Sequence, residues 1–296
     1  MNPHKLSLTS GGSSSGEGAL VGIRGALIGL GSDIAGSVRA PALFNGAYGF
    51  KPTQDRLPYS GQQKLLRKGW PATRPTLGPL AVSAEDLTLV TKTLVLNRPW
   101  IRDSTALAVP WRQVARPTRL RIGFFLEDAS LPVRPPVKRA LRLAAEGLKA
   151  AGHEVITLDQ IPSVRKAMEI MLRGFALDTS NTTAKLLAEA GEEPTRELIE
   201  LQQVVVLDKK DGFNLDDLWR FGADRQDYVE EWAKIWRDHS LDVVLCPGFQ
   251  GVAPLHGQVG VPFYCAPWNL LDVCPIVAFS MFSPNAEPVD DELTLV

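Results

Sequence analysis

Two serine- and glycine-rich segments near the start of the chain could carry nucleophilic chemistry. Residues 11–18 read GGSSSGEG, and residues 31–37 read GSDIAGS. Ser37 closes the second segment, where a loop leaves a predicted strand and enters a predicted helix. Backbone N–H groups at the start of a helix lack partners and can face a developing negative charge. Ser37 is therefore a candidate nucleophile, and Ser13 and Ser14 precede it by 24 and 23 residues.

The same glycines allow other interpretations. The dinucleotide-binding pattern G-x-G-x-x-G fails at residues 29–34, because Ile34 stands where the third glycine belongs. A Ser-His-Asp triad has little support, since none of the four histidines is marked out as a base. A glycine-rich structural turn with capping serines remains open at this point. If a serine is activated, a buried lysine of lowered pKa is the other physical option for its base.

Composition excludes several classes of protein. The 296 residues carry 32 basic and 33 acidic side chains, so the strongly basic surface that non-specific nucleic-acid binding needs is absent. The three cysteines, Cys246, Cys265 and Cys274, suit neither a disulfide framework nor a zinc site and are expected to be reduced core thiols. We expect no metal and no cofactor. The sequence shows neither a signal-peptide pattern nor a long apolar run, which predicts a cytoplasmic protein.

Short elements are predicted to position the serines. The pattern favours a helix over 17–25 that is capped by the preceding serines, a strand over 26–31, a loop over 32–36 and a helix over 37–44. Residues 62–77 read as an irregular connection.

The rest of the chain predicts an α/β arrangement. A helix is expected to begin after Ser83, and residues 120–158 predict a β-α-β unit with parallel strands. Residues 162–239 are predicted to be mostly helical, and 241–246 to form a buried strand. The apolar side chains of 215–236 recur at helical spacing, so they either line an acyl pocket or fill the core.

Longer stretches carry a resemblance to a known family. GGSSSGEGAL at 11–20 and LGSDIAGSVRAPALFNGAYGFKPT at 30–53 resemble the amidase signature family of serine hydrolases, which includes fatty acid amide hydrolase and fungal acetamidases. The segments Gly78-Pro79-Leu80 and Trp268–Asp272 show weaker similarity. The resemblance implies an α/β fold in which a mixed, twisted β-sheet is flanked by helices on both faces.

The resemblance also implies a domain organisation. Residues 1–296 are expected to form one partial amidase-signature domain that is incomplete at the N-terminus. Within it, the signature segment covers 10–56, and a helical substrate-side region covers about 160–240.

Residue roles follow from the resemblance, position by position. Ser37 matches the nucleophile that becomes acylated, and Ser13 matches the serine with a cis peptide bond that bridges base and nucleophile. The oxyanion hole of the family corresponds to the backbone N–H groups of Ile34, Ala35, Gly36 and Ser37. The residues that hold the loops in register match Ser14, Asp33 and Arg39.

The sequence departs from the family pattern at two kinds of position. Ala35 stands where the family usually has glycine, and a side chain there costs stability if the backbone needs a positive φ. The family base is a lysine well upstream of the cis-serine. Lys5 lies only eight residues before Ser13 and is too close to match it. The sequence therefore predicts that Ser37 has an oxyanion hole, whereas the lysine base that the family uses is missing from this chain.

Three functions remain open from the sequence. The first is a serine amidase that hydrolyses a small-molecule or lipid amide, and fatty acid amides are among the candidate substrates. In this case the sequence lacks the N-terminal part of the enzyme. The second is a catalytically inactive amidase-like protein, and the third is the glutaminase subunit of an amidotransferase. A homodimer is compatible with each of them, and peripheral membrane association is compatible with them if an N-terminal segment is missing.

Overall fold

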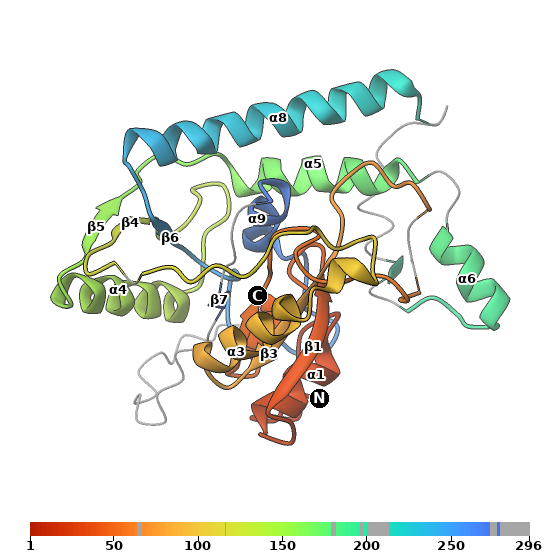
Figure 1. The fold of residues 1–296 in the computed structure, drawn as a ribbon, viewed down its shortest axis with the longest axis horizontal. Helices are drawn as coiled ribbons and strands as arrows, with labels where there is room; N and C mark the ends of the chain where they lie inside the picture. The colour runs from red at the N-terminus through yellow and green to blue at the C-terminus, as the bar shows by residue number, and fades with distance from the viewer. Residues whose placement is uncertain are drawn as a thin grey trace.

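Residues 1–63, 67–115, 117–178, 182–195, 198–199, 213–272 and 277–278 are described by the structure, a computed structural model (Figure 1). Their strands form two sheets, with helices packed around both. The α/β class and the flanking helices agree with the sequence prediction.

The first sheet contains the strand that leads into the Ser37 loop. Its strand order is β1-β3-β2-β7, and the pairs are antiparallel. Ile28 lies opposite Ala81, and Asp33 lies opposite Thr76, so β1 and β3 pair along their whole length. The strands span Ile28–Asp33 (β1), Tyr48–Phe50 (β2), Thr76–Ala81 (β3) and Val277–Ala278 (β7).

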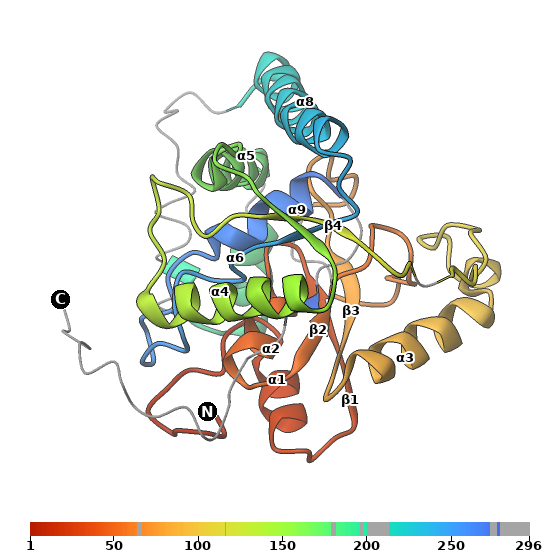
Figure 2. The same ribbon diagram turned by 90° about the vertical axis from the view of Figure 1, so that its left-hand side faces the viewer.

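Helices cover both faces of this sheet. Helices α1 (Ser15–Gly22) and α2 (Arg39–Phe44) lie on one side, and α3 (Ala84–Leu96) lies on the other (Figure 2). The side chain of Ser83 caps α3 by accepting a hydrogen bond from the Asp86 N–H, as its sequence predicts. A small core is buried among these elements and consists of Val21, Val38, Ala42, Ala47 and Leu80.

The second sheet confirms the predicted β-α-β unit. Strand β4 (Arg121–Phe124) lies between β5 (Glu154–Thr157) and β6 (Val243–Leu245), and both pairs are parallel. Helix α4 (Pro135–Ala150) connects β4 to β5. Parallel neighbours need such a crossover, which explains why a helical stripe separates two apolar runs in the sequence.

A layer of helices surrounds a second, larger core, whose buried residues include Met168, Tyr228, Trp232, Trp268 and Leu270. Helix α8 (Leu215–Asp238) runs beside α5 (Val164–Ala176), and α9 (Ala266–Leu270) lies on the inner side of α5 (Figure 1). Helix α8 begins with a capping box between Asn214 and Asp217. Also present are helix α6 (Thr182–Ala190) and two short 3-10 helices, η1 (Pro99–Ile101) and η2 (Phe263–Cys265).

Several local predictions differ from the structure. Strand β3 begins at Thr76, within the stretch 62–77 that was predicted to be irregular, and it continues past the end of that stretch to Ala81. Its Gly78 and Pro79 are uncommon in strands, and pairing with β1 and β2 overrides that preference. The predicted serine cap of α1 is wrong in detail, because Ser14 occupies the N-cap position while its side chain makes no capping hydrogen bond.

Other predictions fall partly outside the described ranges. The helical stretch predicted over 162–239 is described except at 179–181, 196–197 and 200–212. Cys246 and Cys265 are free thiols, as expected, and Cys274 lies outside the described residues. Among the helices of the described ranges, none has the length and apolar character needed to cross a membrane.

Candidate active site

The two serine loops are joined by a backbone hydrogen bond. The Ser14 N–H donates to the carbonyl oxygen of Ser37 at 3.0 Å. The peptide bond between Gly12 and Ser13 is cis. Gly31 lets the loop approach β1 closely, because a Cβ atom at this position would overlap the Ser14 hydroxyl. Ser13 and Ser14 therefore lie next to the strand that ends at the Ser37 loop.

Asn45 fixes the first loop to α2. Its side-chain amide donates to the carbonyl oxygens of Ser10 at 2.9 Å and of Pro41 at 2.7 Å. Asn45 is fully buried, so these hydrogen bonds form away from water. Both loops are consequently anchored on the same short helix, since α2 also follows directly after Ser37 and Val38.

A buried ion pair shapes the Ser37 loop. The guanidinium of Arg39 donates to both carboxylate oxygens of Asp33, at 2.9 and 3.0 Å. The same carboxylate accepts the N–H groups of Gly36 at 2.9 Å and of Val38 at 3.2 Å. Asp33 and Arg39 are both buried, so the carboxylate holds the turn from its inside.

The charges of this pair are strongly stabilised. Burial alone would raise the pKa of the Asp33 carboxyl, but the Arg39 charge and the hydrogen bonds from Arg39, Asn269 and Gly36 lower that pKa well below its usual range. Burial likewise opposes the charged form of Arg39, and Asp33 reverses this effect and raises the pKa of the guanidinium. Both groups are therefore charged at neutral pH.

Gly36 is the position of the turn that requires glycine. Its φ is +122°, and a Cβ atom added to it would lie 2.8 Å from the Cβ and Sγ atoms of Cys265. Ala35 has no positive φ. The alanine at this position, which departs from the family pattern, therefore causes no backbone strain of the left-handed kind.

The turn leaves several N–H groups without a protein acceptor. Within the described part of the chain, the N–H groups of Ile34, Ala35 and Ser37 make no hydrogen bond. The Gly36 N–H differs from them, because it donates to Asp33. Such free donors at a turn before a helix suit the stabilisation of an oxyanion.

A segment near the end of the described chain completes the network, and sequence reasoning gave its residues no role. The carboxamide of Asn269 in α9 accepts a hydrogen bond from Arg39 and donates one to Asp33 at 3.1 Å. Arg39 also donates to the carbonyl oxygen of Cys265 at 3.1 Å. The weak family similarity at Trp268–Asp272 was the signal that could have pointed to Asn269.

The serine hydroxyls themselves differ in exposure. Ser37 is half-buried, and Ser13 is exposed. Cys265 is close to Gly36, but burial raises the pKa of its thiol to about 11, so it is protonated and a poor nucleophile at neutral pH. In the described ranges, no cluster of three or more histidine, cysteine or acidic side chains could hold a metal ion.

Two lysines lie near the site in the sequence, and their environments differ from each other. Lys5 is exposed. Lys51 is buried, its ammonium donates to the Pro52 carbonyl at 2.9 Å, and it lies 4.0 Å from the carboxylate of Asp272. Asp272 also accepts the Gln54 N–H at 2.8 Å, so Lys51 helps to hold the end of the α9 segment against the signature segment.

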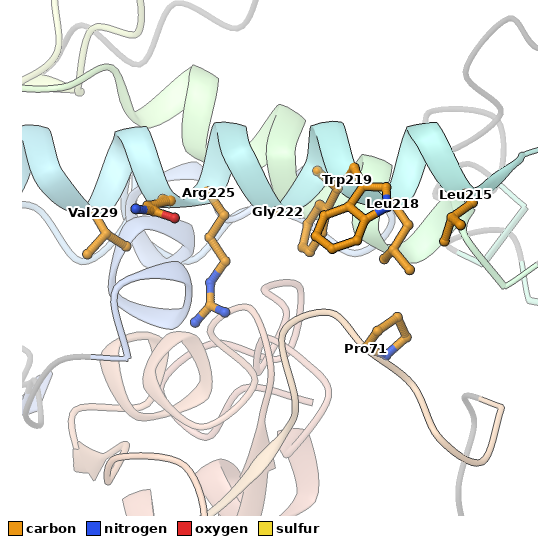
Figure 3. A pocket seen from close by; sticks show the side chains of 9 residues that line it. Pro71, Leu215, Leu218, Trp219, Gly222, Arg225 and Val229 are labelled. Carbon is orange, nitrogen blue, oxygen red and sulfur yellow. The ribbon is translucent and has the colours of Figure 1, made fainter.

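Helix α8 contributes side chains both to the core and to a groove on the surface. Trp232 is 1% exposed and belongs to the large core, whereas Trp219 is 71% exposed. A groove of about 490 Å³ runs between α8 and Pro71, with Trp219 at its wall and Arg225 projecting from the helix (Figure 3). The Nε atom of Arg225 donates to the Leu270 carbonyl at 3.0 Å, which links the groove to α9.

Comparison with known proteins gives consistent results. A family described as Amidase matches residues 1–289. An amidase of Gibberella moniliformis is 48% identical over 92% of this chain and 51% of its own length. An acetamidase of Emericella nidulans is 31% identical over 94% of this chain and 52% of its own length.

A solved structure agrees with these sequence relatives. A fatty acid amide hydrolase superimposes with a TM-score of 0.87 and 33% identity, over 94% of this chain and 48% of that protein. The chain thus spans about half the length of the relatives that it matches. These matches, together with the paired serine loops and the Asp33–Arg39 turn, place the chain in the amidase family.

Proposed function

We propose that Ser37 is the nucleophile of a serine amidase that cleaves a carboxylic amide through an acyl-enzyme. The observation that carries this proposal is the turn held by Asp33 and Arg39, which presents unpaired N–H groups next to a half-buried serine. Donors fixed before the reaction need no reorganisation when negative charge develops on the substrate oxygen.

The proposed reaction has two balanced steps. The Ser37 oxygen attacks the amide carbonyl carbon while its proton passes to a base, and the tetrahedral intermediate expels the amine, which takes up a proton. Water then attacks the ester of Ser37 and releases the carboxylic acid and the free hydroxyl. We assign the developing oxyanion to the N–H groups of Ile34, Ala35 and Ser37.

The remaining N–H group of the turn receives a different role. Gly36 was included in the oxyanion hole by resemblance, but its N–H already donates to Asp33 at 2.9 Å. We therefore propose that it keeps the turn in shape and that oxyanion binding falls to the other three donors.

The proton acceptor is proposed to be neither Lys5 nor Lys51. Lys5 is exposed, and the ammonium of Lys51 is buried against the Pro52 carbonyl and near Asp272. The family resemblance assigns the base to a lysine upstream of the cis-serine, and Ser13 is proposed to pass the proton between that base and Ser37.

The substrate is proposed to be a small-molecule or lipid amide with an apolar acyl part. The groove beside α8 supports this assignment, because Leu215, Leu218 and Trp219 form an apolar wall near a single guanidinium. Such a surface favours an apolar chain over the polar side chain of glutamine.

A chimera tests the proposed function. The matched half of the Gibberella moniliformis amidase is replaced by this chain, and hydrolysis of an aryl or fatty acid amide is measured. The proposal predicts hydrolysis that the Ser37→Ala substitution abolishes. The substitution Ser7→Ala, at an exposed serine outside both loops, is predicted to leave the rate unchanged.

Other outcomes support the alternative functions. A chimera that folds like the parent amidase but does not turn over any amide supports an inactive amidase-like protein. Hydrolysis restricted to glutamine supports the glutaminase alternative.

A further inference from the structure

Ala35 stands in the Ser37 turn at a position where the amidase family usually has glycine, and its methyl group has so far received no role. The residue is half-buried, and its φ is not positive. Within the described part of the chain, its N–H makes no hydrogen bond. Ala35 therefore joins a free backbone donor to a side chain that its glycine counterpart lacks.

Covalent geometry keeps the Ala35 methyl group close to any oxygen that its N–H binds. A Cβ atom lies about 2.5 Å from the backbone nitrogen of its own residue. An oxygen that accepts a hydrogen bond from this N–H lies about 2.9 Å from the same nitrogen. The methyl carbon is then at most about 5.4 Å from the carbonyl oxygen of a bound amide. It is within reach of the groups attached to the carbonyl carbon.

The turn that carries this methyl group is held from two sides. The Asp33 carboxylate accepts the N–H groups of Gly36 at 2.9 Å and of Val38 at 3.2 Å. Cys265 lies behind the turn, because its Cβ and Sγ atoms are 2.8 Å from the place that a Gly36 Cβ atom would occupy. Both Asp33 and Cys265 are buried. Moving Ala35 away from a substrate would therefore disturb a buried ion pair or a packed core.

Ala35 also lies on the side of the proposed acyl group. Its methyl group packs against the larger core, to which Phe221 of α8 belongs. Phe221 is in addition one of the residues that line the groove beside α8, where the apolar acyl part of the substrate is proposed to lie. The core thus links the methyl group to the wall of that groove.

We propose that the Ala35 methyl group is a specificity determinant that selects acyl groups without a branch at the carbon next to the carbonyl. This inference rests on the proposed function and narrows its substrate class. A branch at that carbon places an additional methyl group beside the carbonyl, where Ala35 already occupies space. A site that cannot move accepts an extra methyl group only with strain. A glycine at this position leaves room for the branch.

Two isomeric substrates test this inference. The para-nitroanilides of butyric acid and of isobutyric acid have the same leaving group and the same number of carbon atoms, and they differ only in the branch. The kcat/KM of each is measured with the chimera that contains this chain. The unmodified chimera is expected to prefer the linear butyric anilide. Ala35→Gly is expected to raise the kcat/KM ratio of branched to linear substrate about tenfold, which is typical of one methyl group in an apolar pocket.

A matched control separates the methyl group from a general effect of glycine on the backbone. Ala26→Gly changes another half-buried alanine outside the helices and strands, and Ala26 precedes β1, whereas the Ser37 turn follows that strand. This variant is expected to leave the ratio of the two kcat/KM values unchanged. Comparing ratios also removes any change in the amount of folded enzyme, since both substrates report it equally.

The outcomes distinguish this inference from the proposed function. The inference is overturned if Ala35→Gly leaves the ratio unchanged, if it changes both kcat/KM values by the same factor, or if Ala26→Gly raises the ratio equally. An unmodified chimera that prefers the branched anilide also overturns it. In each of these cases, hydrolysis that Ser37→Ala abolishes still supports the proposed function. A chimera that hydrolyses neither anilide, or whose hydrolysis persists in Ser37→Ala, contradicts the proposed function and the inference together.

Discussion

The backbone N–H of Ser14 and the carbonyl oxygen of Ser37 form a hydrogen bond of 3.0 Å. This contact joins the loop that contains the cis peptide to the loop that contains the proposed nucleophile. It uses backbone atoms alone, so the hydroxyl of Ser37 takes no part in it. The rest of the site fixes the shape of the turn on which this contact depends.

The substitution Asp33→Asn tests the buried ion pair. It would leave the buried Arg39 guanidinium without its counter-charge, and we expect the free energy of unfolding to fall by about 3–5 kcal/mol in urea denaturation. Asp55→Asn is the matched control, because the Asp55–Arg74 pair is much more exposed and should contribute less than about 1 kcal/mol. Equal losses in the two variants would contradict a structural role for Asp33.

The pH dependence of stability tests the same pair differently. The pKa of Asp33 in the folded chain lies below its ordinary value of 3.8, so its stabilising effect is complete above that pH and is lost as the pH falls further. The difference in stability between the unmodified chain and Asp33→Asn should therefore narrow below about pH 3.8. A difference that stays constant between pH 6 and pH 2, in roughly the range where carboxylates titrate, would argue against a lowered pKa.

Gly36→Ala tests the backbone of the turn. The positive φ of Gly36 and the contact that a Cβ atom would make with Cys265 predict a loss of about 1–3 kcal/mol. Gly147→Ala on α4 is the matched control, since its Cβ atom would meet nothing within 4 Å. Alanine favours a helix over glycine, so this control should be stabilised by about 0.5–1 kcal/mol. Thermal unfolding of the two variants would disprove the account if both shifts had the same sign.

Asn269→Leu tests the contact between α9 and the Ser37 loop. It leaves a buried donor on Arg39 and a buried acceptor on Asp33 without one partner each, and we expect a loss of about 1–3 kcal/mol. Asn97→Leu, at an exposed helix end, should change stability by less than about 0.5 kcal/mol. Guanidinium denaturation would show a comparable effect at both positions if Asn269 were not part of the network.

Two tryptophans on α8 separate its core face from its groove face. Trp232→Ala should lower the free energy of unfolding by about 3–5 kcal/mol, because Trp232 packs against Phe125 and Trp268 in the core. Trp219→Ala should change it by less than about 0.5 kcal/mol, since this side chain is largely exposed at the groove. If Trp219→Ala proved as costly as Trp232→Ala, the groove would have to be covered in solution.

The sequence predicts local features of the site better than distant ones. Asp33, Gly36 and Arg39 lie within seven residues, so the motif could indicate their association before the structure was known. Asn269 reaches the same carboxylate from 236 residues away, and no local pattern reveals such a contact. The exposure of Trp219 beside the burial of Trp232 also depends on which helices pack against α8.

The strands show the same distinction. The unit formed by β4, α4 and β5 follows from apolar periodicity and was predicted from the sequence. Strand β3 was missed because Gly78 and Pro79 resemble a turn, and it becomes a strand through pairing with β1 and β2 on its two sides.

Labelling of Ser37 is the most direct test of the proposed nucleophile. The chimera that contains this chain is treated with a fluorophosphonate, and the modified residue is located by tandem mass spectrometry. The account predicts an adduct on Ser37 that is absent from the Ser37→Ala variant and unaffected by Ser7→Ala. A folded chimera without an adduct on Ser37, or with an adduct on another serine that persists in Ser37→Ala, would contradict it.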